Sequence, residues 1–262
     1  MKKYLYNTII VTVLLAITIS CTDDFVERPV EYSIDSENYF NSKEEYESAL
    51  IGAYDLLQST YINVMLGEIA SDNTLAGGES ATDVIGIQEI DDMIHTPVNQ
   101  QLRDIWSWMY AGTNRANYIM EFQDKTDFQG KNVVLAQARF LRAYYYFELV
   151  KWFGDVPLSV DKRIQFGDQF ELERTPKAEV YAQIEQDLIF AAANLPASWE
   201  ESETGRATKG AAQALLGKAY LYQEKWSLAA EALDQVIAGP YELVTDYNSI
   251  FPQGQTLLYG RI

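Results

Sequence analysis

The pattern of apolar and polar positions along most of the chain is that of amphipathic helices. Ser42 and Glu45 have the three-residue spacing of a helix capping box, and after them apolar side chains recur every three or four residues from Tyr46 to Leu57. This spacing keeps one face of an α-helix apolar. A second such stripe follows Pro97 and comprises Leu102, Ile105, Trp106, Met109, Tyr110, Thr113 and Ala116.

The segment from Lys131 to Phe153 is apolar nearly all round, which predicts a central helix rather than a peripheral one. Gly154, Asp155 and Pro157 end it, and residues 155–174 are expected to form a loop. Helix start and stop signals then predict three more helices, the first with Pro176 at its first helical position after Thr175. These helices are expected from Pro176 to Pro196, from Thr208 to Tyr222, and from Trp226 to Ala238.

Two of the predicted helices share an internal repeat. Gln137-Ala138-x-x-x-Arg142-Ala143-Tyr144-x-Tyr146 recurs as Gln213-Ala214-x-x-x-Lys218-Ala219-Tyr220-x-Tyr222. The second copy also fits the tetratricopeptide pattern, with small residues at which two helices can approach closely. Chance similarity between two helices rich in Ala and Tyr is the alternative. We predict an all-α fold of tetratricopeptide-like helical hairpins with long loop insertions.

The first twenty residues have the plan of a signal peptide. Lys2 and Lys3 precede a charge-free apolar stretch from Ile9 to Ile19, and the only cysteine, Cys21, follows Ser20. An apolar helix of this length would reach only about 16 Å, too short to cross a bilayer. We predict that residues 1–20 are a lipoprotein signal peptide, that Cys21 becomes the acylated (palmitate-carrying) N-terminus, and that residues 21–40 form a linker.

Composition narrows the classes of function. The chain has 20 Lys and Arg against 38 Asp and Glu, so a nucleic acid would be repelled. A single Cys and a single His exclude a Cys/His zinc site and a disulfide framework. Aromatic residues are plentiful, and 18 of them are Tyr, which packs with its ring and offers a hydroxyl to a partner. We expect no cofactor and no metal; a calcium site is disfavoured because the sequence after Asp72 fails the EF-hand pattern.

Two segments together resemble the RagB/SusD family. They are Tyr110-Ala111-Gly112-Thr113-Asn114-Arg115-Ala116-Asn117 and the run from Ala138 to Leu158, which includes Trp152-Phe153-Gly154-Asp155-Val156-Pro157-Leu158. The resemblance implies that residues 41–262 are a SusD-like helical repeat domain of a Bacteroidetes lipoprotein. Members are usually about twice as long, so a fragment that lacks C-terminal sequence is expected. Asp23 and Asp24 after Cys21 are similar to the tag that sends such lipoproteins to the outer face of the outer membrane, although a solvated linker is the alternative.

The resemblance also implies a function. Family members bind oligosaccharides, and in some cases peptides, and cap a SusC-like TonB-dependent outer-membrane transporter. For sugar binding an exposed aromatic face and fixed amide and carboxylate groups are needed. Asp72, Asn73 and Asp83 in the Gly-rich stretch Gly67–Thr96, which is expected to be a long loop, and Trp108, which lies off the buried stripe, are the predicted ligand-binding residues. A solvated loop and a packing tryptophan are the alternative.

Other residues with chemistry are given structural roles. Arg139 and Arg142 lie on an otherwise apolar helix and are expected to pair with carboxylates of neighbouring helices, because an unpaired buried charge is costly. Trp199 is expected to pack over its own loop, with contact to ligand or transporter as the alternative. No nucleophile motif lies near His95, so no enzymatic activity is expected.

Two alternatives to a glycan-binding lipoprotein remain open. The first is a helical-repeat scaffold that binds only protein. The second, less favoured, is a glycoside hydrolase, which needs only two carboxylates at a suitable separation.

Overall fold

The computed structural model describes residues 38–80, 82–160, 162–165, 167–168 and 172–247. The chain divides into two compact units, residues 1–39 and residues 40–262, and every helix of the described chain lies in the second. The predicted signal peptide, the acylation site at Cys21 and most of the predicted linker lie outside the described residues. Among those residues, no helix is both long and apolar enough to span a bilayer.

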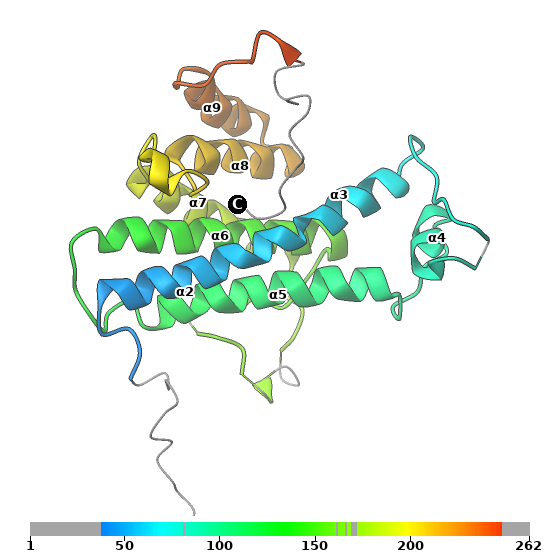
Figure 1. Cartoon of the computed structure of the whole chain (residues 1–262), viewed down its shortest axis with the longest axis horizontal. Helices are drawn as coiled ribbons and strands as arrows, with labels where there is room; N and C mark the ends of the chain where they lie inside the picture. The colour runs from blue at the N-terminus through cyan, green and yellow to red at the C-terminus, as the bar shows by residue number, and fades with distance from the viewer. Residues whose placement is uncertain (1–37, 81, 161, 166, 169–171, 248–262) are drawn as a thin grey trace, which may run out of the picture. The chain divides into compact units, whose positions relative to one another are not determined.

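The described part of the chain is helical, as predicted. Its first layer consists of three long helices, of which α2 packs on both α5 and α6 (Figure 1). The capping box is present: the Ser42 hydroxyl accepts from the Glu45 N–H at 3.4 Å, and the Glu45 carboxylate accepts from the Ser42 N–H at 3.3 Å. The elements here are α2 (Lys43–Asp55), the 3₁₀ turn η2 (Leu56–Ser59), α3 (Thr60–Ile69), α4 (Ile85–Asp91), α5 (Gln100–Glu121) and α6 (Lys131–Phe153).

The remaining helices stack in chain order on α6, each against the one before (Figure 1). The Thr208 hydroxyl caps α8 by accepting from the Ala211 N–H, as the sequence predicts. The two repeat copies lie in α6 and α8, which are the first helices of two successive hairpins. The elements are α7 (Lys177–Asn194), the 3₁₀ turn η4 (Glu201–Glu203), α8 (Lys209–Tyr222) and α9 (Trp226–Ile237).

Small residues set the closest approaches between helices. A Cβ added to Gly217 of α8 would lie 2.6 Å from Leu233 Cγ of α9, and one added to Gly112 of α5 would lie 2.5 Å from the Tyr145 ring of α6. Gly112 and Tyr145 come from the two segments that carry the family resemblance. These segments therefore hold α5 and α6 together.

Two boundaries differ from the prediction. The stretch Gly67–Thr96 is not loop throughout, because α3 continues to Ile69 and the short helix α4 forms within it. Only Ile90 of α4 is buried, so no apolar period reveals this helix. Pro176 is the N-cap of α7 rather than its first helical residue, and the Asp155 carboxylate accepts from the Lys177 N–H at 2.8 Å.

Buried tyrosine hydroxyls make the fold sensitive to alkaline pH. Burial raises the pKa of Tyr54 to about 12 and also raises the pKa of Tyr145. The Tyr54 hydroxyl donates to Gln137 Oε1 at 3.0 Å and accepts from the Ala207 N–H at 2.9 Å. Between pH 10 and 12 the unfolded chain loses these protons while the folded chain keeps them, so stability falls as pH rises.

We therefore expect the free energy of unfolding to fall above pH 10, by about 1.4 kcal/mol per pH unit for each such tyrosine. Urea titrations at pH 9 and pH 11.5 measure the fall, and Tyr54→Phe should make it smaller. An unfolding free energy that is the same at both values would contradict the expectation.

Candidate functional site

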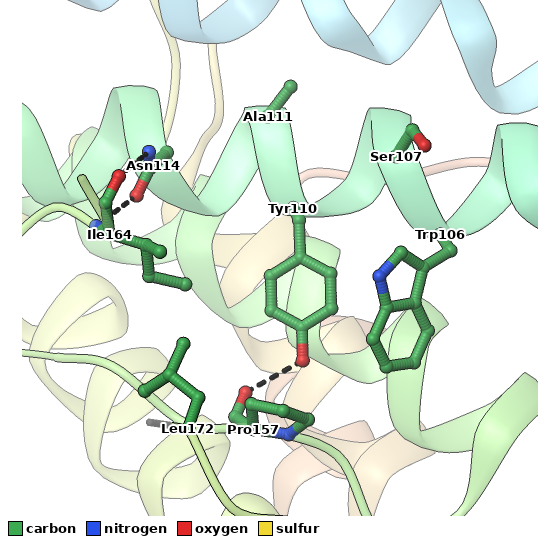
Figure 2. A pocket seen from close by; sticks show the side chains of 8 residues that line it. All are labelled: Trp106, Ser107, Tyr110, Ala111, Asn114, Pro157, Ile164 and Leu172. Atoms are coloured by element: carbon green, nitrogen blue, oxygen red, sulfur yellow. Dashed lines mark hydrogen bonds between the residues drawn. The ribbon is translucent and has the colours of Figure 1, made fainter. Parts of the chain in front are cut away.

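A cavity of about 450 Å³ opens between α5 and the loop that joins α6 to α7 (Figure 2). We call it the loop cavity. Three residues of the loop face one side of α5 across it, and the Trp106 and Tyr110 rings lie along that side. The lining residues are Trp106, Ser107, Tyr110, Ala111, Asn114, Pro157, Ile164 and Leu172.

Hydrogen bonds fix the far wall of the loop cavity to α5. The Tyr110 hydroxyl donates to the Pro157 carbonyl oxygen at 2.8 Å. The Asn114 side chain pairs with the backbone of Ile164 in both directions, donating at 2.8 Å and accepting at 2.7 Å. A tyrosine hydroxyl is neutral at physiological pH, and burial raises the pKa of Tyr110 further, so this hydroxyl acts as a neutral donor. With these polar groups engaged, the cavity offers a ligand mainly apolar and aromatic surface.

A second cavity of about 720 Å³ lies where α4, the start of α5 and the end of α6 meet. We call it the helix-end cavity. Trp106 lines both cavities, and its ring lies 4.8 Å from that of Tyr110 and 5.1 Å from that of Phe153. These three rings form an aromatic row that joins the two cavities. The helix-end cavity is lined by Ala70, Ile90, Met93, His95, Thr96, Pro97, Leu102, Arg103, Trp106, Trp152, Phe153 and Arg174.

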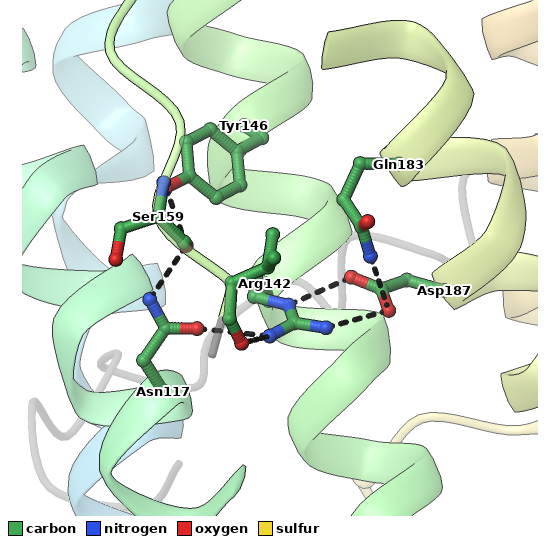
Figure 3. A network of polar contacts seen from close by, with 7 residues as sticks. Asn117, Arg142, Tyr146, Ser159, Gln183 and Asp187 are labelled. Atoms are coloured by element: carbon green, nitrogen blue, oxygen red, sulfur yellow. Dashed lines mark hydrogen bonds and ion pairs between the residues drawn. The ribbon is translucent and has the colours of Figure 1, made fainter. Parts of the chain in front are cut away.

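A buried ionic network ties the loop between α6 and α7 to the helices (Figure 3). The Arg142 guanidinium of α6 makes a bidentate pair with Asp187 of α7, at 2.7 and 2.8 Å. It also donates to Asn117 Oδ1 of α5 at 2.9 Å and to the Val160 carbonyl oxygen of the loop at 2.6 Å. Asn117 Nδ2 donates to the Ser159 carbonyl oxygen at 2.8 Å. This one network therefore ties three helices to the loop.

Arg139 and Arg142 were both predicted to pair with carboxylates of neighbouring helices, and the structure shows an ion pair for Arg142. Arg142 pairs with a carboxylate of a neighbouring helix as predicted. Arg139 forms no ion pair within the described chain: its guanidinium stacks over the Phe190 ring at 4.1 Å, and its Nε has no hydrogen-bond partner there. The Asp187 carboxylate of α7 nevertheless opposes the lowering of the Arg139 pKa by burial.

Trp199 packs over its own loop as expected. Its ring contacts the buried cluster that includes Leu195 and Ala207, and its indole N–H donates to the Ala207 carbonyl oxygen at 2.9 Å.

The four predicted ligand-binding residues lie outside the linings of both cavities. Asp72 and Asn73 are exposed after the end of α3. Asp83 is exposed too, and its carboxylate accepts from the Glu79 N–H at 3.2 Å within its own loop. Trp108 is 37% exposed and thus lies off the buried stripe of α5 as predicted. These residues come from the stretch that includes α4 and from the first half of α5, but no hydrogen bond or ion pair of the described chain joins them to one another.

Sequence reasoning missed Trp106 and Tyr110 as site residues because it assigned both to the buried stripe. Both are half-buried, whereas Ile105, Met109 and Thr113 of the same stripe are fully buried. The sequence does contain one signal for this site: the Gly-Asp-Val-Pro turn after Phe153 begins a long loop. This part of α5 faces that loop and not another helix, so its rings are less completely covered.

Within the described residues, no group of three or more His, Cys, Asp or Glu side chains is placed to hold a metal ion. His95 lines the helix-end cavity and is exposed. No hydrogen bond or ion pair joins it to a nucleophile among those residues.

Comparisons with known proteins agree on one family. Residues 24–221 match the profile of a family described as starch-binding and associating with the outer membrane. A SusD-like protein of Formosa agariphila is 24% identical over 257 residues, which cover 94% of this chain and 49% of that protein. The chain spans about half the length of the curated relatives it matches, or less.

Solved structures show the same similarity. A laminarin-binding SusD-like protein has a TM-score of 0.73 and 32% identity, over 80% of this chain and 48% of that one. Surface glycan-binding protein A from Bacteroides thetaiotaomicron, solved in complex with laminarihexaose, has a TM-score of 0.70 and 25% identity. That match covers 80% of this chain and 46% of the solved one.

Proposed function

Because this chain belongs to the SusD-like family of outer-membrane-associated proteins, we propose that it captures oligosaccharides by non-covalent contacts and passes them to a transporter. The observation that carries the proposal is the aromatic row of Tyr110, Trp106 and Phe153, which joins two open cavities in a fold of this family. A pyranose ring presents apolar C–H faces that pack on aromatic rings, and its hydroxyls need fixed polar partners.

The rigidity of the site supports binding without a large conformational change. The loop wall is fixed by the Tyr110 and Asn114 hydrogen bonds and by the Arg142 network. A preformed surface loses little conformational entropy when a ligand binds. Capture followed by import requires no bond to be broken, and we propose that the chain has no enzymatic activity of its own.

The proposed partner is a SusC-like TonB-dependent transporter, and the proposed anchor is acylated Cys21 after removal of residues 1–20. Family membership and the sequence plan of the N-terminus support both. We further propose that the lipid holds the protein on the outer face of the outer membrane. The formal charge of −18, which becomes −20 when Lys2 and Lys3 leave with residues 1–20, gives no attraction to anionic head groups, so the lipid must supply the attachment.

The exposed residues Asp72, Asn73, Asp83 and Trp108 are retained as proposed secondary contacts for the ligand. Their exposure leaves Asp72, Asn73 and the Trp108 ring available to solvent-borne groups. Since they line neither cavity, an oligosaccharide would have to extend beyond the aromatic row to reach them.

Isothermal titration of the purified chain against neutral and acidic polysaccharides and peptides tests the proposed function. We expect saturable binding to at least one glycan and no release of reducing sugar from it. Binding to no glycan, together with retained association with the transporter, would instead indicate a scaffold for proteins. Release of reducing sugar would indicate a glycoside hydrolase.

A further inference from the structure

The helix-end cavity differs from the rest of this acidic protein in the charge of its lining. Arg103, Arg174 and His95 line it, and none of its lining residues is acidic. The whole chain has 38 acidic residues against 20 basic ones. Acidic residues outnumber basic ones in the chain as a whole, whereas the wall of this cavity carries two guanidinium groups and no carboxylate.

Its two arginines also lack the partners that most other described arginines have. Arg115, Arg142, Arg163 and Arg206 form ion pairs with Asp55, Asp187, Glu121 and Glu47, respectively. Neither Arg103 nor Arg174 has a carboxylate partner within the described chain, although Arg103 donates one hydrogen bond to Gln100 Oε1 at 2.5 Å.

The nearest acidic residues in sequence do not neutralise these guanidinium groups. The Asp104 carboxylate accepts from the Gln100 side-chain amide at 2.9 and 3.1 Å, and exposed Glu173 makes no ion pair with its neighbour Arg174 among the described residues. Arg174 lines the helix-end cavity together with Trp106 and Phe153 of the aromatic row. Its positive charge also opposes the effect of burial on the pKa of Tyr110, the third residue of that row.

From this arrangement we propose that the helix-end cavity binds an acidic saccharide. A sugar ring packs on Trp106, and its carboxylate or sulfate group is held by Arg103 and Arg174. A guanidinium presents several N–H donors in a planar fork that matches both kinds of oxyanion. The inference rests on the proposed glycan-binding function and specifies the ligand class for it.

The test compares binding of three probes to the full chain by isothermal titration in 0.15 M NaCl, which screens the repulsion due to the net negative charge. Oligogalacturonate carries carboxylates, sulfated carrageenan oligosaccharide carries sulfates, and laminarihexaose is neutral. We expect at least one acidic probe to bind more tightly than laminarihexaose. The double variant Arg103→Gln/Arg174→Gln should weaken that binding tenfold or more, by about 1.4 kcal/mol or more.

Arg115→Gln is the matched control, because Arg115 lies on the same helix as Arg103, is exposed and lines neither cavity. It should leave the affinity for the acidic probe unchanged. Binding of laminarihexaose alone, or an acidic probe whose affinity survives the double variant, would overturn the inference while leaving the glycan-binding function intact. Binding to no glycan would overturn both. Polyglutamate is titrated as a fourth probe: its arginine-dependent binding, without binding of any glycan, would assign the cavity to an acidic protein segment instead.

Discussion

Replacing Asp187 with alanine is expected to lower the free energy of unfolding by about 3–5 kcal/mol, because the variant leaves the Arg142 charge buried without its carboxylate. Both side chains are almost inaccessible to solvent, with 1% of the Asp187 side chain and 3% of the Arg142 side chain exposed. The substitution also frees the Gln183 side chain, which donates to the same carboxylate at 3.1 Å. Urea denaturation followed by circular dichroism measures the loss.

Asp55→Ala is the matched control for this prediction. Asp55 pairs with Arg115 at 3.1 Å, but both side chains are about half exposed, so the loss should stay below about 1 kcal/mol. The double variant Arg142→Met/Asp187→Leu removes both charges and should recover most of the stability. Equal destabilisation by Asp187→Ala and Asp55→Ala would show that the buried network does not have this role.

Much of the fold follows from local sequence signals. The helix predicted from Lys131 to Phe153 has those bounds in the structure, since Gly154 ends it as a C-cap with a φ of 69° and Pro157 follows three residues later. Ser42 and Thr208 cap helices through their own hydroxyls, so these starts are encoded within four residues. Helices whose buried stripe spans several turns are likewise visible as a period in the sequence.

Features that depend on tertiary neighbours could not be predicted in the same way. Helix α4 buries a single residue and is held by Asn99, whose side-chain amide donates to the Gly86 carbonyl oxygen and to Glu89. Arg139 and Arg142 look alike in sequence, yet only Arg142 pairs with a carboxylate of α7. Such a difference arises from the position of a residue around the helix and from the partner that the facing helix supplies.

The site was less predictable than the fold for the same reason. Sequence reasoning placed ligand contacts in the exposed loop residues and Trp108, and it placed Trp106 and Tyr110 in the core. An apolar stripe cannot tell a ring that contacts a packed helix from a ring that contacts an open loop cavity. The position of the loop over α5 depends on hydrogen bonds between the loop backbone and the side chains of Asn114 and Asn117. Both residues lie in a segment that carries the family resemblance, but that segment does not indicate which loop residues they bond.

Trp106→Ala is expected to weaken binding of the oligosaccharide ligand about 30-fold or more, because aromatic residues at the centre of a binding surface contribute about 2 kcal/mol or more. Trp106 is the residue shared by the two cavities, and its ring is the middle one of the aromatic row. Isothermal titration with the best-binding glycan of the panel measures the loss. Trp106→Phe keeps an aromatic face and should retain much of the affinity.

Two further tryptophans supply comparison variants for this prediction. Trp226 of α9 is 62% exposed and lines neither cavity, so Trp226→Ala should bind the glycan as the unmodified chain does. Trp108→Ala tests the site predicted from the sequence, since Trp108 follows Trp106 by two residues and lies off the buried stripe. If Trp108→Ala abolishes binding while folded Trp106→Ala retains it, the ligand lies along the exposed loop residues and not along the aromatic row. The opposite result assigns the binding surface to the two cavities, because only Trp106 is common to both.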